Sequence, residues 1–100
     1  MMKTQTNCSV GKYGILHLDY IKAHRKETYT TLMMEGRLNE YLHRVDTNAR
    51  KTFSRLVREY AKKRGIDEQL KASDPLRWVQ EMNNCKSSAE EIVLKEMIYV

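Results

Sequence analysis

The chain has 100 residues, of which 41% are hydrophobic and 31% charged, and its formal net charge is +5. A chain of this length forms about one small domain and buries only about two-thirds of the surface that it exposes when unfolded. These values exclude a two-domain enzyme with a cleft between lobes, a complete recombinase or polymerase, and a disordered protein.

Helix is the secondary structure that the sequence favours throughout. Only four glycines and one proline interrupt it, and the stretches between them are rich in residues that lose little side-chain freedom in a helix. No stretch alternates apolar and polar residues long enough to indicate a sheet. The sequence therefore predicts an all-α fold, a compact single-domain bundle of about four to five helices over residues 11–100, after a weakly ordered tail at residues 1–10.

The first two helices are predicted at residues 13–24 and 26–35. On the first, one face is formed by side chains three and four residues apart: Leu16, Tyr20, Ile21 and His24. On the second, the side chains expected to point inward are Tyr29, Leu32 and Met33. Gly36 then stands where a helix C-terminus favours a left-handed residue.

A long amphipathic helix is predicted next, at residues 38–64. Its apolar positions are separated by three or four residues throughout: Leu38, Tyr41, Leu42, Val45, Ala49, Phe53, Leu56 and Tyr60. Asp46 and Thr47 are suited to cap a fresh helix, so the segment is either one helix or two joined by a kink. Gly65 marks its end, with Ile66 placed to fold back.

The last long helix is predicted to start at Asp74, as N-cap, with Pro75 at the first position. A short helical turn at residues 67–72 precedes it. Its apolar stripe is expected to run to the C-terminus through Leu76, Val79, Met82, Ala89, Ile92, Val93 and Met97. At 1.5 Å per residue this helix is roughly 30–35 Å long.

Signals for catalysis or cofactor binding are weak. The sequence has no Walker A loop, GxGxxG, HExxH or GxSxG motif, and Gly11-Lys12-Tyr13-Gly14 is too short to cradle a phosphate, so it is interpreted as a turn that enters the first helix. His17 and His24 are suited to one helix face, but His43 lies elsewhere and no cysteine pair supports zinc. We therefore expect a non-enzymatic protein without catalytic residues, metal or other cofactor.

The cysteines and the apolar runs bear on localisation. Cys8 and Cys85 have no CxxC spacing, and a small secreted domain usually carries more disulfides. The first ten residues do not resemble a signal peptide, and the longest apolar runs are far too short to span a bilayer. The expectation is a cytoplasmic protein with reduced thiols and no membrane partner.

Charge is distributed unevenly along the chain. Residues 37–64 hold nine Lys or Arg against three acidic residues, whereas residues 65–100 hold four against seven. Five cations of the basic segment lie within about 60° of one another on a helix, opposite the apolar stripe. They are Arg44, Lys51, Arg55, Arg58 and Lys62. This face is interpreted either as an ordinary solvated surface or as a stripe that follows the phosphates of a nucleic acid.

The acidic C-terminal segment also has two interpretations. Glu81, Glu90 and Glu91 form either a solvated face or a surface that mimics nucleic-acid phosphates and binds a nuclease. Trp78 lies one position off the apolar stripe. It is interpreted either as a half-buried edge of the core or as an exposed anchor for a partner.

Several short runs are similar in type and order to those of a known family. The N-terminal runs are Gly11-Lys12-Tyr13-Gly14, Tyr20-Ile21-Lys22-Ala23-His24-Arg25 and Tyr29-Thr30-Thr31-Leu32. The later ones are Gly36-Arg37-Leu38, Leu70-Lys71-Ala72, Trp78-Val79, Met82-Asn83, Ala89-Glu90-Glu91-Ile92-Val93 and Ile98-Tyr99. Over about residues 11–100 the chain resembles the TnpV family of small accessory proteins encoded on transposons and related mobile elements of Gram-positive bacteria. The resemblance implies a mobile-element setting, and it carries over no catalytic residues because the family has no established chemistry.

Three functional hypotheses follow from these observations. The leading one is a non-catalytic accessory protein that binds nucleic acid or a nucleoprotein complex through the basic helix face. The second is an inhibitor of a host defence nuclease, similar in action to an anti-CRISPR protein, that works by protein–protein binding. The third is a structural subunit or helical homodimer, in which Met33, Met34 and Trp78 form an apolar patch.

Overall fold

The computed structural model describes residues 10–100, so the tail predicted at residues 1–10 lies outside the described part except for its last residue. Helices occupy 86% of the described residues, with no strand among them. They are α1 (Lys12–His24), α2 (Lys26–Met34), α3 (Leu38–Lys63), α4 (Glu68–Ser73), α5 (Pro75–Val93) and η1, a single π-helical turn (Leu94–Ile98). The predicted all-α bundle with a long central and a long C-terminal helix is confirmed.

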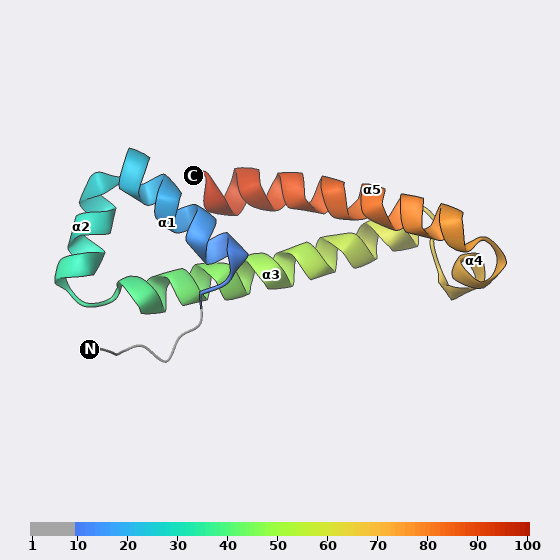
Figure 1. Cartoon of the computed structure of the whole chain (residues 1–100), viewed down its shortest axis with the longest axis horizontal. Helices are drawn as coiled ribbons and strands as arrows, with labels where there is room; N and C mark the ends of the chain where they lie inside the picture. Colours follow the sequence, from blue (N-terminus) through green and yellow to red (C-terminus); the bar gives the residue numbers. More distant parts are fainter. Residues whose placement is uncertain (1–9) are drawn as a thin grey trace.

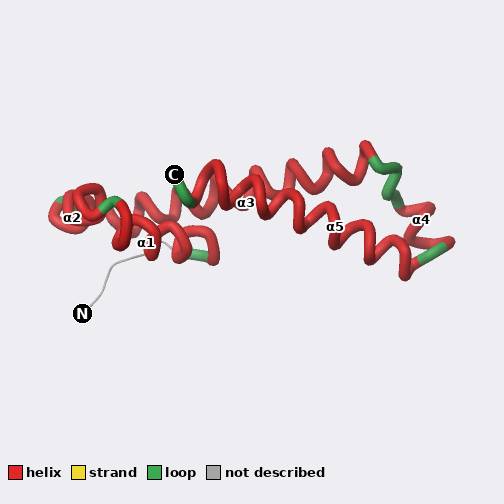
Figure 2. Tube along the Cα trace, turned by 90° about the horizontal axis from the view of Figure 1, so that it is seen from above, coloured by secondary structure: helices red, strands yellow, loops and turns green. Residues whose placement is uncertain are grey.

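The two long helices define the shape of the molecule. Figure 1 shows α3 and α5 antiparallel along the long axis, with α1 and α2 at one end and α4 at the other. Figure 2, seen from above, shows α4 joining the end of α3 to the start of α5. The bundle measures 55 × 27 × 17 Å. One end is therefore a three-helix arrangement of α1, α3 and the C-terminal helix, and the other is a helical hairpin closed by α4.

Two glycines end helices as the sequence predicted. Gly36 and Gly65 both have φ +68°, the left-handed region that favours glycine. After Gly36, the Arg37 amide donates back to the Leu32 carbonyl (2.9 Å), and after Gly65 the Ile66 amide donates to Ala61 (2.9 Å). These hydrogen bonds satisfy carbonyls that the helix ends leave free.

The core consists of two clusters that share side chains. The three-helix cluster has Tyr13, Ala49, Val93 and Ile98 at its centre, and the hairpin cluster has Val57, Ile66, Cys85 and Ala89. Phe53 and Leu56 are partly buried and pack against both clusters. The middle of α3 thus joins the two ends of the molecule into one apolar core.

The inward face of α5 differs from the predicted stripe. Leu76 and Val79 are 70% and 45% exposed, whereas Trp78 packs against the hairpin cluster and Cys85 is fully buried with a free thiol. The sequence-based assignment of Leu76 and Val79 to the core is wrong. The physical reason is that α4 packs against the start of α5 and covers the side on which Trp78 lies.

On α2, Met33 was also predicted to point inward and is 52% exposed, while Leu32 next to it is buried. Only one side of this short helix contacts the rest of the bundle, through α1 and α3. A helix covered on one side buries a narrower stripe than the sequence pattern indicates.

Candidate nucleic-acid interface

A buried carboxylate anchors α1 on the helix that carries the basic face. Asp46 in the middle of α3 is fully buried, and its Oδ1 accepts hydrogen bonds from the backbone N–H of Tyr13 (3.0 Å) and of Gly14 (3.2 Å). Its Oδ2 lies 2.9 Å from Nε of Arg50. Asp46 therefore caps the N-terminus of α1 from another helix and does not start a new one, and α3 runs without a break.

The glycines at the start of α1 allow this helix to approach α3 closely. A Cβ on Gly14 would lie 2.9 Å from the carbonyl oxygen of Leu42, a backbone atom that cannot move aside easily. Gly11 is the N-cap of α1, and a Cβ there would lie 2.8 Å from Asp46. The run does enter the first helix, as predicted, and its glycines let α1 sit directly on α3.

His17 connects three segments of the chain. Its Nδ1 lies 2.8 Å from the carbonyl oxygen of Ile98, and its Nε2 lies 2.8 Å from the hydroxyl of Tyr41. Because a carbonyl only accepts, Nδ1 carries the proton, and in the neutral imidazole Nε2 accepts from Tyr41. Burial raises the pKa of Tyr41 above its ordinary value. Both ring nitrogens of His17 are thus used inside the protein, whereas His24 is exposed.

Glu90 on α5 holds the start of α1 from the other side. It accepts hydrogen bonds from the Lys12 ammonium and the Tyr13 hydroxyl, and its side chain is 27% exposed. Burial acts to raise the pKa of Glu90, but the two hydrogen bonds and the charge of Lys12 together outweigh it and lower that pKa. Burial and then Glu90 raise the pKa of Tyr13 well above its ordinary 10.0. The cluster is therefore stable with Glu90 ionised and Tyr13 neutral.

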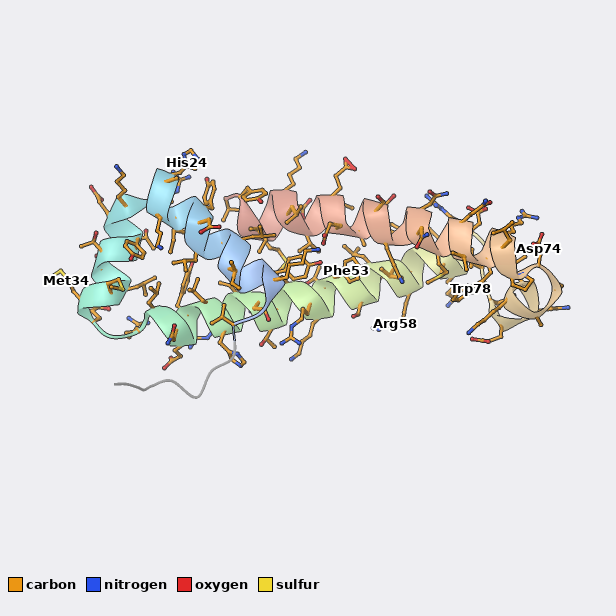
Figure 3. The ribbon with its side chains drawn as sticks, viewed as in Figure 1. His24, Met34, Phe53, Arg58, Asp74 and Trp78 are labelled. Atoms are coloured by element: carbon orange, nitrogen blue, oxygen red, sulfur yellow. The ribbon has the colours of Figure 1, made fainter. Side chains whose placement is uncertain are left out.

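The five cations predicted to form a basic face are all exposed on α3. Two of them form exposed ion pairs on the same helix, Arg44 with Glu40 and Arg55 with Glu59, each at 3.1 Å. The other three have no ion pair with any residue in the described part of the chain: Lys51, Arg58 and Lys62. Figure 3 shows Arg58 on the side of α3 that faces away from α5. We call the five residues the α3 stripe.

The α3 stripe borders a shallow hollow of about 600 Å³ on the surface of α3. Its cationic lining comes from Arg50, Lys51, Arg55 and Arg58, and its neutral lining from the hydroxyl side chains Thr47, Thr52 and Ser54. Arg50 was not part of the predicted face, because it lies about 120° around the helix from the centre of the stripe. It lines the hollow while its Nε pairs with buried Asp46.

The acidic residues of the alternative interface do not share one face. Glu81 and Glu90 are nine positions apart, about half a turn around α5, and Glu90 is held by α1 while Glu91 is exposed. Trp78 is partly buried, with the ammonium of Lys71 4.8 Å from its ring centroid. Its interpretation as a half-buried edge of the core is confirmed.

The apolar patch considered for a dimer is not continuous. Figure 3 places Met34 and Trp78 at opposite ends of the molecule, which is 55 Å long. The combination of Met33, Met34 and Trp78 in one patch is therefore wrong, because α2 and the start of α5 occupy different ends of the bundle.

Two general features of residues 10–100 complete the description. No helix among them has both the length and the apolar character needed to cross a membrane. No three His, Cys, Asp or Glu side chains of this part of the chain come together in a way that would hold a metal ion.

The family model described as "Transposon-encoded protein TnpV" matches residues 1–98. This match covers nearly all of the chain, so the chain belongs to the TnpV family, and the resemblance seen in its short runs is confirmed. No curated protein and no solved structure matches the chain.

Proposed function

We propose that this transposon-encoded TnpV protein is a non-catalytic accessory protein that binds nucleic acid, or a nucleoprotein complex, through the α3 stripe. The observation that carries the proposal is the set of three exposed cations on one helix face without an ion-pair partner in residues 10–100: Lys51, Arg58 and Lys62. Cations in such positions release counterions when they meet phosphates, which gives a favourable, salt-dependent term for binding.

The paired cations of the stripe support the same surface. Exposed ion pairs four residues apart on a helix contribute only about 0.3–0.5 kcal/mol, and those of Arg44 and Arg55 are more than half exposed at both partners. A phosphate therefore displaces Glu40 or Glu59 at small cost. Arginine also binds phosphate through two parallel N–H donors, which gives it an advantage over lysine at such contacts.

The unbroken α3 gives the stripe its geometry. From Arg44 to Lys62 the helix rises about 27 Å at 1.5 Å per residue, so the cations form a straight row on a rigid element. Contacts of this kind go to phosphates and carry no direct sequence information. The expected binding is therefore strong at low salt and similar on unrelated sequences.

The test compares two triple variants with the same change of charge. In the stripe variant, Lys51, Arg58 and Lys62 are replaced by Gln. In the control variant, Lys26, Arg77 and Lys95 are replaced by Gln, three exposed cations outside α3 that also have no ion pair in residues 10–100. Fluorescence anisotropy on DNA and RNA at several salt concentrations should show the log–log salt slope flatter by about 2.7 in the stripe variant, at about 0.9 per phosphate contact on duplex DNA.

Equal slopes in the two triple variants, or no binding by the wild type at low salt, would contradict the proposal. Circular dichroism and thermal melts of both variants control for folding, since exposed substitutions usually change stability by about 0.5 kcal/mol or less each.

The rival function, inhibition of a host defence nuclease, has less support from the geometry. A phosphate mimic needs carboxylates that project together, and Glu90 is instead bound to Lys12 and Tyr13. Retention of a host nuclease by a chain that binds neither DNA nor RNA would favour this rival.

A further inference from the structure

A second hollow lies beside the α3 stripe, between α3 and α5 at the start of α1. It is an open groove of about 800 Å³, within the roughly 300–1,000 Å³ of sites that hold small organic molecules. Three cations from three different helices line it: Lys12 of α1, Arg50 of α3 and Lys86 of α5. We call it the α3–α5 groove.

The rest of the lining is neutral or aromatic. Ser54, Asn83 and Ser87 are exposed and offer hydrogen-bond donors and acceptors. Phe53 also lines the groove, and it is only partly buried although it lies on the apolar stripe of α3. Its ring centroid is 6.4 Å from that of Tyr13, which is buried, so the accessible aromatic surface of the groove comes from Phe53. The groove therefore combines positive charge, polar groups and aromatic surface.

The α3–α5 groove is continuous with the surface that carries the α3 stripe. Arg50 and Ser54 line both the groove and the hollow over α3. A chain of phosphates that follows Arg58, Arg55 and Lys51 along α3 therefore reaches Arg50, and from there the groove opens towards Lys86.

We infer that the α3–α5 groove binds one or more nucleotides of a single-stranded nucleic acid whose phosphates lie along the α3 stripe. This inference rests on the proposed function and makes it more specific, because it names the form of nucleic acid. Single-strand binding combines a basic track for the backbone with aromatic side chains on which bases stack, and both features meet at Arg50 and Phe53.

The accessibility of the bases favours a single strand over a duplex. The groove is open and is lined by partly buried Phe53, so an unstacked base of a single strand reaches the Phe53 ring. The bases of a duplex are stacked inside the double helix and do not reach Phe53. A duplex therefore contacts the protein only through its phosphates, along the α3 stripe.

Glu90 acts as an internal competitor at the groove. It lines the groove and pairs with Lys12, so its carboxylate partly neutralises that cation and repels phosphate. Arg50 is likewise paired, with buried Asp46. Lys86 has no ion pair with any residue in the described part of the chain. Lys86 is therefore the cation that meets the first phosphate, and removal of the Glu90 charge should strengthen binding.

The experiment measures the affinity of the full chain for oligothymidine and for a duplex with the same number of phosphates, by anisotropy at several salt concentrations. The wild type should bind the single strand more tightly. Lys86→Ala should flatten the single-strand log–log salt slope by about 0.7, and Lys95→Ala, about half a turn away on the C-terminal helix, should leave it unchanged. Glu90→Gln, which keeps an acceptor for Tyr13, should tighten single-strand binding.

A steric variant tests the groove itself. Ser87→Trp places a large ring in the groove from an exposed position, and it should reduce binding of oligothymidine to the level of the duplex without changing duplex affinity. Equal affinity of the wild type for both forms, or an unchanged preference in Ser87→Trp, would overturn the inference. If Ser87→Trp fails to fold by circular dichroism, equal salt slopes for Lys86→Ala and Lys95→Ala overturn it.

The outcomes separate the inference from the proposed function. A stripe variant that loses duplex binding while the groove variants bind both forms like the wild type leaves the proposed function intact and rejects the groove. A wild type that binds neither form at low salt rejects both. RNA oligouridine in parallel distinguishes a preference for RNA from one for DNA, because only RNA offers a 2′-hydroxyl to the polar side chains of the groove.

Discussion

At the three-helix end of the bundle, polar side chains reach from one helix to another, whereas at the hairpin end the contacts between helices are mostly apolar. Asp46 caps α1 from α3, His17 joins α1 to α3 and to the C-terminal turn, and Glu90 holds α1 from α5. At the hairpin end, the side chains of Asp67 and Asp74 accept hydrogen bonds from amides three residues ahead, at the starts of α4 and α5.

This difference indicates how the short helix α1 is held in place on the pair of long helices. α1 covers only part of the α3–α5 pair, so apolar area alone specifies its placement weakly. Buried hydrogen bonds are directional, and a buried group without its partner is costly. We therefore expect the three-helix end to depend on individual polar groups and the hairpin end on packing.

The largest expected effect concerns the side chains shared by the two ends. Phe53→Ala or Leu56→Ala should destabilise the protein by about 2–5 kcal/mol, because each removes contacts with both core clusters. Val79→Ala, at a position that the sequence assigned to the core, should change stability by no more than about 0.5 kcal/mol, because the side chain is exposed. Urea denaturation measures all three. A free energy of unfolding unaffected by Phe53→Ala would show that the clusters do not share a core.

A smaller effect is expected from the aspartate caps, and it separates the two ends directly. Asp46→Ala leaves the buried amides of Tyr13 and Gly14 without an acceptor and should cost about 2–4 kcal/mol, at about 1–2 for each of the two amides. Asp74→Ala removes an exposed local cap and should cost about 1 kcal/mol. If urea denaturation gave the same loss of unfolding free energy for both variants, the two ends would not differ in their dependence on polar groups.

The smallest effect is a pH dependence that belongs to the three-helix end. The folded protein raises the pKa of Tyr13 and Tyr41, so the unfolded chain loses these protons first, and stability should fall as pH rises above 10.0. The folded protein lowers the pKa of Glu90, so its contribution is present above 4.5 and is lost as pH falls further. Thermal melts measure the melting temperature as a function of pH. Above pH 10.0 this temperature should fall less steeply in the double variant Tyr13→Phe, Tyr41→Phe than in the wild type. An unchanged slope would place the alkaline loss elsewhere.

Much of the candidate interface was predictable because it depends on helical period alone. The exposure of all five stripe residues follows from their spacing on one helix. The groove was not predictable in this way, since Lys12 and Lys86 are 74 positions apart and meet only because α1 and α5 both lie against α3. Arg50, which lines both the groove and the hollow over α3, was missed because it lies about 120° around the helix from the centre of the stripe.

The sequence by itself determined the all-α class, the order of the helices, and helix ends such as Gly65 and Asp74. Each of these depends on interactions within about four residues, which are the same in any tertiary setting. Only the tertiary structure decided that Asp46 caps another helix and that Trp78, not Val79, faces the core. Both outcomes depend on which distant segment lies opposite, and helical period gives the angle of a side chain but not the identity of its neighbour.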